Sequence, residues 1–259
     1  MNPYRLPVCG IDVMLRQPAG REDLVLLEAP TAGVSAAVAL LGAIARGSDG
    51  RALDWAALPA SDVDAAILRV RQMTLGDAVR ADARCPAQAC GKTIEIAFTI
   101  GDFLTHHAPR RPRLVEPVGA QEGWYRLVDT PVTFRIPTGG DLMAQAGVSQ
   151  AARELIRRCV RPHDLRGPLL ARVERALEAM APNLTSDLRA RCPECGAAVA
   201  LHFDAREFAL RELHAQAAFI YEDMHLLARQ YHWSESEILA LPRDRRLQYV
   251  EMLRHHGEP

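Results

Sequence analysis

The chain has 259 residues, of which 49% are hydrophobic, and its formal net charge is −1. This length accommodates two small domains of about 100 residues and an appendage. A charge so close to zero argues against a nucleic-acid surface, because binding to phosphates needs clustered positive charge. No window approaches the roughly 18 apolar residues of a membrane span, and the N-terminus lacks a signal-peptide core. We therefore expect a cytoplasmic protein with reduced thiols and no membrane span.

The first half of the chain predicts two strands, two helices and a linker. Residues 11–18 alternate loosely and end at a Pro-Ala-Gly turn, as expected of a strand. Residues 36–45 are apolar and rich in helix formers, which predicts a buried helix. Ser61-Asp62 provides an N-cap for a second helix. The alternation of residues 93–100 predicts a half-buried strand, and the proline-containing segment 105–122 predicts a linker.

The second half predicts the same order of elements. Residues 132–136 are expected to form a strand, residues 150–160 and 169–180 two amphipathic helices, and residues 198–203 a further strand. Before that last strand, Thr185 to Arg189 is expected to form a short helical piece. Helices combined with a few antiparallel strands, without strict alternation, predict an α+β fold.

From Leu210 onward the chain predicts only helices. Four apolar residues that follow one another at intervals of 4, 3 and 4 positions predict an amphipathic helix with one apolar stripe. They are Ile220, Met224, Leu227 and Tyr231. Ser234 and Glu237 form a capping box for a short helix over residues 235–240, and Pro242 fits the first turn of a last helix. The stripe needs cover from the chain's own lobes or from another chain. The candidate partner-binding residues are Tyr221, Met224, Leu227, Tyr231 and Trp233.

Two segments repeat each other around paired cysteines. Ala-Arg-Cys-Pro occurs at residues 83–86 and again at 190–193, and each copy opens a turn that closes at a Cys-Gly pair. In both copies the second cysteine precedes a final phenylalanine by 13 residues. We predict an internal duplication that gives two related small lobes, each with helices, short antiparallel strands and a paired-cysteine knuckle, followed by a helical tail. The expected units are residues 1–118, 119–210 and 211–259.

The paired cysteines predict a structural zinc site. Tetrahedral zinc takes four thiolate or imidazole ligands, and a closely spaced pair on a turn supplies two of them. We expect one Zn²⁺ shared by both knuckles, with the ligands Cys85, Cys90, Cys192 and Cys195. Three other interpretations stay open at this point. Each knuckle could bind its own zinc with help from His106, His107 or His202, the Cys-Pro-Glu-Cys motif could be redox-active, or the knuckles could bind nothing.

The sequence offers no catalytic constellation. It contains no nucleophile elbow, P-loop, HExxH motif or dinucleotide-binding glycine pattern. A closed shell of four thiolates would also leave the metal without an open position for water or substrate. We therefore expect neither an enzyme nor a site for a small-molecule substrate.

Short motifs in the units and in the tail resemble known families. The units resemble the T4-type baseplate protein family of contractile phage tails through Arg135-Ile136-Pro137-Thr138-Gly139, Leu184-Thr185-Ser186-Asp187 and the stretch from Cys192 to Phe208. The second knuckle is one residue shorter than that family's pattern, and the first unit is the more divergent copy. The tail, from Tyr221 through His232-Trp233 to Leu241, is similar to short helical tail-assembly factors encoded beside contractile injection systems.

The resemblance implies a structural or assembly component of a phage tail or phage-like contractile injection system. Its partners would be other baseplate or tail proteins, and it could be incorporated into a phage-like particle. The competing interpretation is a zinc-ribbon-like nucleic-acid-binding or regulatory module, favoured by the knuckles and by the basic run Arg243, Arg245 and Arg246. A zinc-dependent hydrolase would need an open metal position beside a carboxylate, and the sequence indicates neither.

Overall fold

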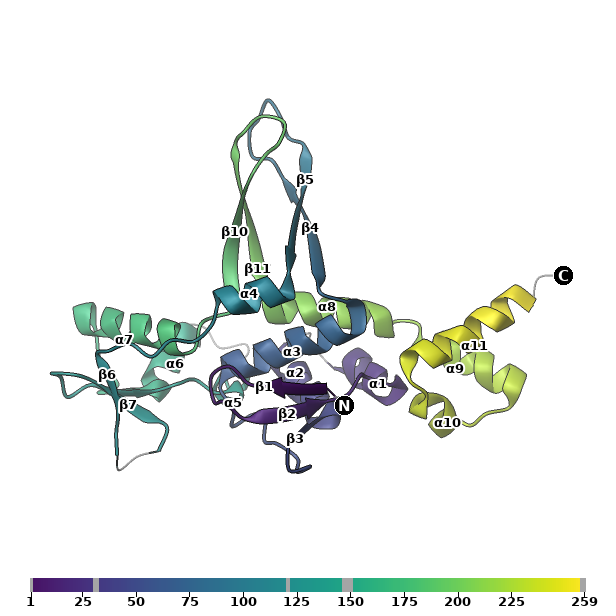
Figure 1. The fold of residues 1–259 in the computed structure, drawn as a ribbon, viewed down its shortest axis with the longest axis horizontal. Helices are drawn as coiled ribbons and strands as arrows, with labels where there is room; N and C mark the ends of the chain where they lie inside the picture. The colour runs from purple at the N-terminus through teal and green to yellow at the C-terminus, as the bar shows by residue number, and fades with distance from the viewer. Residues whose placement is uncertain (1, 30–32, 120–121, 146–150, 257–259) are drawn as a thin grey trace.

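The computed structural model describes residues 2–29, 33–119, 122–145 and 151–256. It confirms a mixed fold in which helices are combined with small antiparallel sheets. Figure 1 shows a central body, a second lobe at one end of the long axis, a helical tail at the other end, and a narrow stalk that projects from the body. Within the described ranges no helix is both long and apolar enough to cross a bilayer.

The body packs helices against a three-stranded antiparallel sheet. The strands, in the order β1-β2-β3, are β1 (Asn2–Arg5), β2 (Asp12–Leu15) and β3 (Ala45–Gly47). The helices are α1 (Gly20–Glu28), α2 (Val34–Ile44), α3 (Ala60–Leu75) and α8 (Ala205–Ala217). Apolar side chains from all of these helices share one core. The helix α8 therefore belongs to the body, although its sequence lies in the second half of the chain.

The second lobe has its own antiparallel sheet and its own core. The strands, in the order β6-β7-β8-β9, are β6 (Val115–Pro117), β7 (Trp124–Leu127), β8 (Thr133–Arg135) and β9 (Val160–Arg161). The helices are α5 (Gly139–Met143), α6 (Ala151–Cys159) and α7 (Gly167–Met180). Phe134, Val160 and Val173 lie in a core that is separate from that of the body.

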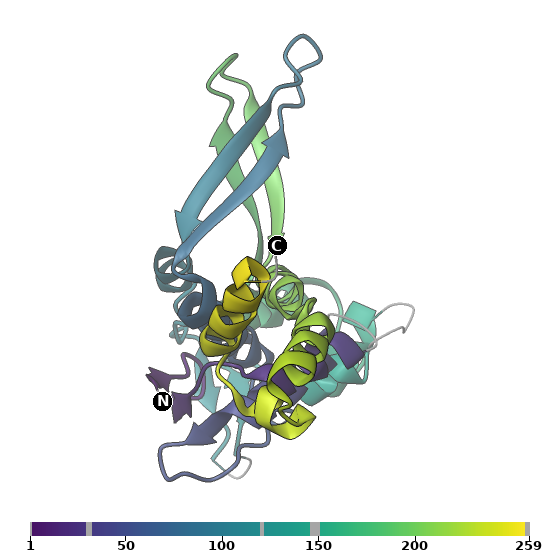
Figure 2. The ribbon, with the colours of Figure 1, turned by 90° about the vertical axis from the view of Figure 1, so that its right-hand side faces the viewer.

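The stalk consists of two β-hairpins. The first pairs β4 (Ala78–Arg84) with β5 (Thr93–Thr99) and leads into α4 (Ile100–His106); the second pairs β10 (Thr185–Arg191) with β11 (Ala198–Asp204). Figures 1 and 2 show the hairpins running side by side away from the body. A small apolar cluster fills the space between them, and Ala83, Ile94 and Val199 are buried in it.

The tail is an assembly of three short helices, α9 (Ile220–Tyr231), α10 (Glu235–Ala240) and α11 (Arg243–His256). The predicted capping box is present at α10: the Ser234 N–H donates to Glu237 at 2.8 Å, and the Glu237 N–H donates back to the Ser234 hydroxyl at 3.4 Å. Leu227, Ile238 and Val250 form a core within the tail.

The described elements follow the same order in both halves of the chain. From β1 to α4, and again from β7 to α8, the order is two strands, two helices, a strand, a helix, a hairpin and a helix. Strand β6 precedes the second series, and the tail follows it. The last strand of each small sheet pairs with the second strand of its series: β3 pairs with β2, and β9 pairs with β8.

Several local predictions differ from the structure. The segment Thr185–Arg189 is not helical but forms most of β10, because pairing with β11 satisfies the backbone of the segment that leads into the knuckle. The helix α3 begins at Ala60 and not behind Ser61-Asp62, since the carboxylate of Asp62 instead accepts the N–H groups of Val8 and Cys9 at 2.8 and 2.9 Å.

Other boundaries shift by smaller amounts. The expected linker 105–122 includes the end of α4 and all of β6, while its residues 120 and 121 lie outside the described part of the chain, as does Gln150. The expected unit boundary at 210 falls inside α8. The sequence does not predict strand β4, because two of its three inward-facing residues are alanines and the alternation of burial is therefore weak in the sequence.

A strand–turn–helix module occurs at the same place in both halves. Arg16 pairs with Glu22 at 2.7 Å beside the start of α1, and Arg135 pairs with Asp141 at 2.8 Å beside the start of α5. Each acid also accepts the backbone N–H of the helix N-cap residue, at 2.8 and 2.9 Å. The arginine therefore fixes the carboxylate that caps the helix.

Both turns dock in the same way onto a proline that precedes a long helix. Ala19 forms a β-bridge with Pro242 before α11, and Thr138 forms one with Pro59 before α3. In the second contact the Gly139 N–H donates to the carbonyl of Leu58 at 3.0 Å. The second lobe is thus attached to the body much as the body is attached to the tail.

Gly139→Ala is expected to weaken the attachment of the second lobe by about 1–3 kcal/mol, as overpacking does elsewhere. A Cβ at this position would lie 2.9 Å from the carbonyl oxygen of Trp55, which is backbone and has little room to move. Urea unfolding measures the loss, and Gly119→Ala is the control, since nothing lies within 4 Å of a Cβ there. Equal stability of the two variants would contradict the docking contact.

Asp141 is expected to contribute stability that depends on pH. Desolvation raises the pKa of Asp141, but the Arg135 guanidinium and the Thr138 N–H outweigh it and lower the pKa from 3.8 to about 2. The carboxylate therefore stabilises the folded state above about pH 4, by about 2 kcal/mol, and this contribution is lost as the pH falls toward 2. Urea unfolding of Asp141→Asn should show that deficit near neutral pH and a shrinking deficit below pH 4. A deficit that stays constant down to the lowest pH would show that Asp141 is not paired as described.

Candidate metal centre

Each cysteine pair lies on the turn of one stalk hairpin. In both turns the N–H of the first cysteine donates to the carbonyl two residues beyond the second, at 2.8 Å for Cys85 and 2.9 Å for Cys192. The residue after the second cysteine is a glycine with positive φ, +57° at Gly91 and +74° at Gly196. Glycine adopts this left-handed conformation without steric penalty. The two turns therefore present their sulfur atoms in the same manner despite their different lengths.

The four sulfur atoms meet at the tip of the stalk. Cys85 Sγ lies 3.6 Å from Cys195 Sγ, and Cys90 Sγ lies 3.8 Å from Cys192 Sγ. All four atoms lie within 4.8 Å of one another. The first cysteine of each knuckle thus faces the second cysteine of the other, which is the relation expected of a two-fold arrangement. This cluster can hold a metal ion.

The spacing fits tetrahedral coordination. Thiolates at about 2.3 Å from a tetrahedral zinc ion lie about 3.8 Å from one another. The two facing pairs, at 3.6 and 3.8 Å, already have that spacing. An ion at the centre would be surrounded by protein ligands on all sides, which is the arrangement of structural sites and not of catalytic ones.

The four thiols differ in their environment. Cys85 and Cys192 are buried, Cys90 is half-buried and Cys195 is exposed. Desolvation raises the pKa of Cys192, but the backbone N–H groups of Cys195 and Glu194 outweigh it and lower the pKa to about 7. The backbone at Ala87 favours the Cys85 thiolate, yet burial and the neighbouring thiols raise its pKa to about 12. One thiol therefore ionises readily while its neighbour keeps its proton, and metal binding would release that proton.

Aromatic side chains from both halves meet at the base of the stalk. Phe203 makes edge-to-face contacts with Phe98 and Phe103, each with ring centroids 5.1 Å apart, and a tilted contact with Phe208 at 5.1 Å. Such pairs contribute about 0.5–1.5 kcal/mol beyond the area they bury. The hairpins are therefore held together at the base by aromatic rings, and the cysteine cluster lies at the opposite end.

The candidate histidine ligands do not join the cluster. His107 Nδ1 lies 2.9 Å from the carbonyl oxygen of Phe103 at the base of the stalk, and His202 Nδ1 lies 3.1 Å from Asp187. Among the described residues, the group able to hold a metal ion consists of the four cysteines. The Cys-Pro-Glu-Cys turn joins two strands, whereas a thioredoxin-like motif would join a strand to a helix.

Comparison of the chain with protein-family models, with curated proteins and with solved structures finds no match. The likeness of the units and the tail to contractile-tail proteins therefore stays a prediction from short motifs.

The candidate partner-binding residues of the tail divide into two groups. Leu227 is fully buried in the core of the tail, and Met224 and Trp233 pack against that core. Trp233 also stacks on Tyr231, with ring centroids 4.9 Å apart. Tyr221 and Tyr231 remain exposed, at 52% and 36%. A partner could therefore reach the two tyrosines, whereas Leu227 holds the tail itself together.

A buried ionic cluster between body and tail was missed by sequence reasoning. Asp23 of α1 pairs with Arg243 and Arg246 of α11, and the second contact measures 2.6 Å. Arg246 also donates to Asp223 of α9 at 3.1 Å. All four residues are at most 5% exposed. The one available sequence signal is the spacing of Arg243, Arg246 and Val250, which places the arginines on the apolar face of their helix.

Proposed function

We propose that this chain is a non-enzymatic structural or assembly component of a phage tail or phage-like contractile injection system, with a stalk closed by one structural Zn²⁺. The observation that carries the proposal is the cysteine cluster at the stalk tip. Its four sulfurs come from two hairpins and have tetrahedral spacing, so a bound ion would have no position for a substrate. Such an ion joins chain segments and performs no chemistry. The kind of assembly is taken from the resemblance to baseplate and tail-assembly proteins.

Zinc is the ion that best suits the cluster. Tetrahedral sites of four thiolates occur with zinc and in iron–sulfur proteins. The short turns with their left-handed glycines suit zinc knuckles, in which two ligands lie on one tight loop. A colourless protein with one zinc is expected, whereas a coloured protein containing iron would overturn this assignment.

We infer that the two halves arose by internal duplication and are related by a pseudo-two-fold axis along the stalk. Three observations support this. The described elements occur in the same order in both halves, the facing sulfur pairs exchange under a two-fold rotation, and each half carries one capped arginine–acid turn. A metal on the axis would then join one copy to the other.

The burial of two arginines counts against the nucleic-acid alternative. Arg243 and Arg246 of the basic run are buried in ion pairs with Asp23, and Arg245 alone remains exposed. A phosphate backbone requires several cations that are free at the surface. We therefore do not prefer a DNA- or RNA-binding function for the tail.

The proposal is tested in the organism that encodes the chain. Deletion of its gene is expected to abolish assembled contractile tails in electron micrographs, and the intact chain supplied in trans should restore them. Cys192→Ser should fail to restore the tails, whereas Gly119→Ala, at an open surface turn, should succeed. Normal tails in the deletion strain would overturn the proposal.

A further inference from the structure

An open pocket lined by apolar residues and by two arginines lies on the second lobe, between α7 and the start of its sheet. Its volume is about 300 Å³, and it is lined by Leu114, Val115, Leu127, Ala176, Arg172 and Arg175 together with Pro112. Leu114 is 55% exposed and lies in the lining of this pocket, so it adds apolar surface that a bound side chain would cover. A cavity of about 150 Å³ is enough to bind a benzene molecule, so this pocket can receive an aromatic side chain.

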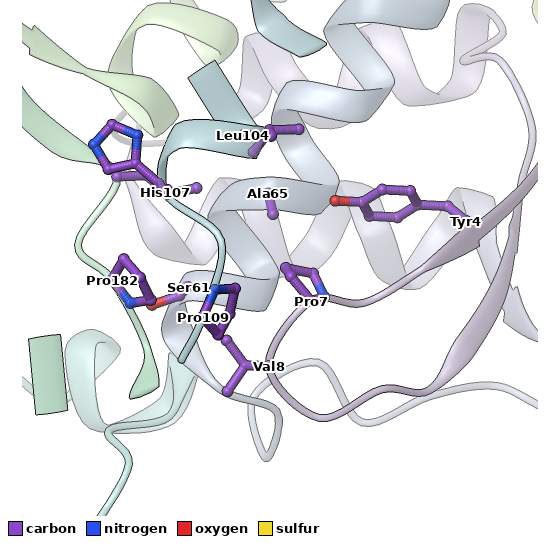
Figure 3. Close-up of a pocket in the computed structure, with 10 residues that line it drawn as sticks. Tyr4, Pro7, Val8, Ser61, Ala65, Leu104, His107, Pro109 and Pro182 are labelled. Carbon is purple, nitrogen blue, oxygen red and sulfur yellow. The ribbon is translucent and has the colours of Figure 1, made fainter. Parts of the chain in front are cut away.

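A second, much smaller pocket lies against α3, the helix of the first half whose place in the order of elements matches that of α7. Tyr4 in β1 and Ala65 in α3 line that pocket, and its volume is only about 40 Å³. Ala65 in α3 and Arg172 in α7 occupy matching positions in the two halves, because each lies 20 residues before the first cysteine of its knuckle. Leu104 of α4 and His107, which directly follows α4, are among the residues that line this smaller pocket (Figure 3). In the second half the helix in the position of α4 is α8, which packs on α3 and α1 and contributes no residue to the lining of the open pocket.

The lining of the open pocket carries positive charge, because it includes Arg172 and Arg175. Arg172 and Arg175 make no ion pair with any carboxylate in the described part of the chain; the Arg175 Nε donates only to the carbonyl of Ala171 at 3.2 Å. Residues 110–180 contain twelve arginines and eight carboxylates, whereas residues 211–259 contain six arginines and eight carboxylates. The second lobe is therefore basic and the tail acidic, which favours contact between the two when they belong to different molecules.

The tail exposes an aromatic and acidic patch of matching chemistry, made of Phe219, Tyr221 and Glu222. Phe219 is 55% exposed and Tyr221 52% exposed, at the start of α9. The Glu222 side chain is 71% exposed and has only a long, exposed contact of 4.0 Å with Arg254. A large exposed aromatic beside a carboxylate that has only this weak ion pair has the composition of an interface anchor.

We propose that the pocket on the second lobe receives Phe219 of a second copy of this chain, with Glu222 of that copy facing Arg172 and Arg175. Figure 1 places α7 and α9 at opposite ends of the long axis, so one molecule cannot join its own pocket and patch. The contact is head-to-tail, and repetition of it gives a closed ring or an open filament. This inference does not depend on the metal, and it goes beyond the proposed function by naming the chain's own copy as a partner.

Sedimentation velocity of the full-length chain over the micromolar range tests the proposal. The intact protein is expected to associate as its concentration rises, and more weakly at high salt. Phe219→Ser, Arg175→Glu and Glu222→Arg should each weaken association by about tenfold or more. Arg113→Glu, which changes a nearby exposed arginine outside the pocket lining, is the matched control and should change association far less.

The decisive step mixes two variants. Arg175→Glu carries an altered pocket and an intact patch, and Glu222→Arg carries the reverse, so a mixture of the two should associate more strongly than either variant alone. A protein that is monomeric at every concentration, or a mixture that stays monomeric, would overturn the proposal. So would association that persists in the Phe219→Ser variant. A zinc-loaded monomer would leave the proposed function standing, so the two failures are distinguishable.

Discussion

Removal of the metal is expected to loosen the whole stalk while the body stays folded. Chelation, or Cys192→Ser, should speed amide hydrogen exchange by at least about tenfold across β4, β5, β10 and β11. The reason is that an isolated two-stranded hairpin is only marginally stable, and the apolar cluster between the hairpins is small. A structural zinc ion contributes about 10 kcal/mol or more of apparent binding free energy. The core that surrounds α2 and α3 contains none of the four cysteines, so these helices should keep their protection.

The matched control for this experiment is Cys9→Ser, which changes an exposed cysteine outside the cluster and should leave the stalk protected. If the stalk amides of the metal-free protein exchanged as slowly as before, the aromatic contacts at its base would suffice to hold the hairpins together. The cluster would then have no structural role.

Asp23→Ala is expected to detach the tail from the body and to lower the free energy of unfolding by about 3–5 kcal/mol. The substitution leaves Arg243 and Arg246 buried, and only Arg246 retains a carboxylate partner, Asp223. Burying an uncompensated guanidinium is strongly unfavourable. Limited proteolysis should then cut the connection between α8 and α9, and urea unfolding should show an early transition for the tail.

Asp244→Ala is the control for the tail experiment. Asp244 is the neighbour of Arg243 on the same helix, but it is exposed and makes no ion pair in the described part of the chain. Its replacement should change stability by less than about 0.5 kcal/mol. If the two variants unfolded at the same urea concentration, the buried ionic cluster would not be what holds the tail.

The features that were predicted correctly from the sequence are those encoded by neighbouring residues. The knuckle turns follow from cysteines spaced around proline and glycine, and the capping box at Ser234 follows from a serine and a glutamate three residues apart. The stripe of α9 follows from helical spacing. In the first two cases the stabilising contacts lie among neighbouring residues, and in α9 the helical spacing marks the face that packs on Ile238 and Val250, so local pattern and structure agree.

The features that were missed depend on contacts between distant segments. Thr185–Arg189 has no strong strand signal of its own and becomes extended because β11 pairs with it. The placement of α8 in the body depends on α3 and α1, far away in the chain. The pairing of Asp23 with Arg243 joins residues 220 positions apart. No periodicity within either segment could reveal these contacts.

The most direct test of the shared metal centre is native mass spectrometry of the purified chain before and after chelation. The account predicts one zinc ion per chain, and it predicts that Cys85→Ser and Cys192→Ser each abolish binding, because both knuckles supply ligands to the same ion. Two zinc ions per chain, or a variant of one knuckle that keeps a full complement of metal, would contradict a shared site. A folded, metal-free protein would contradict a metal centre altogether.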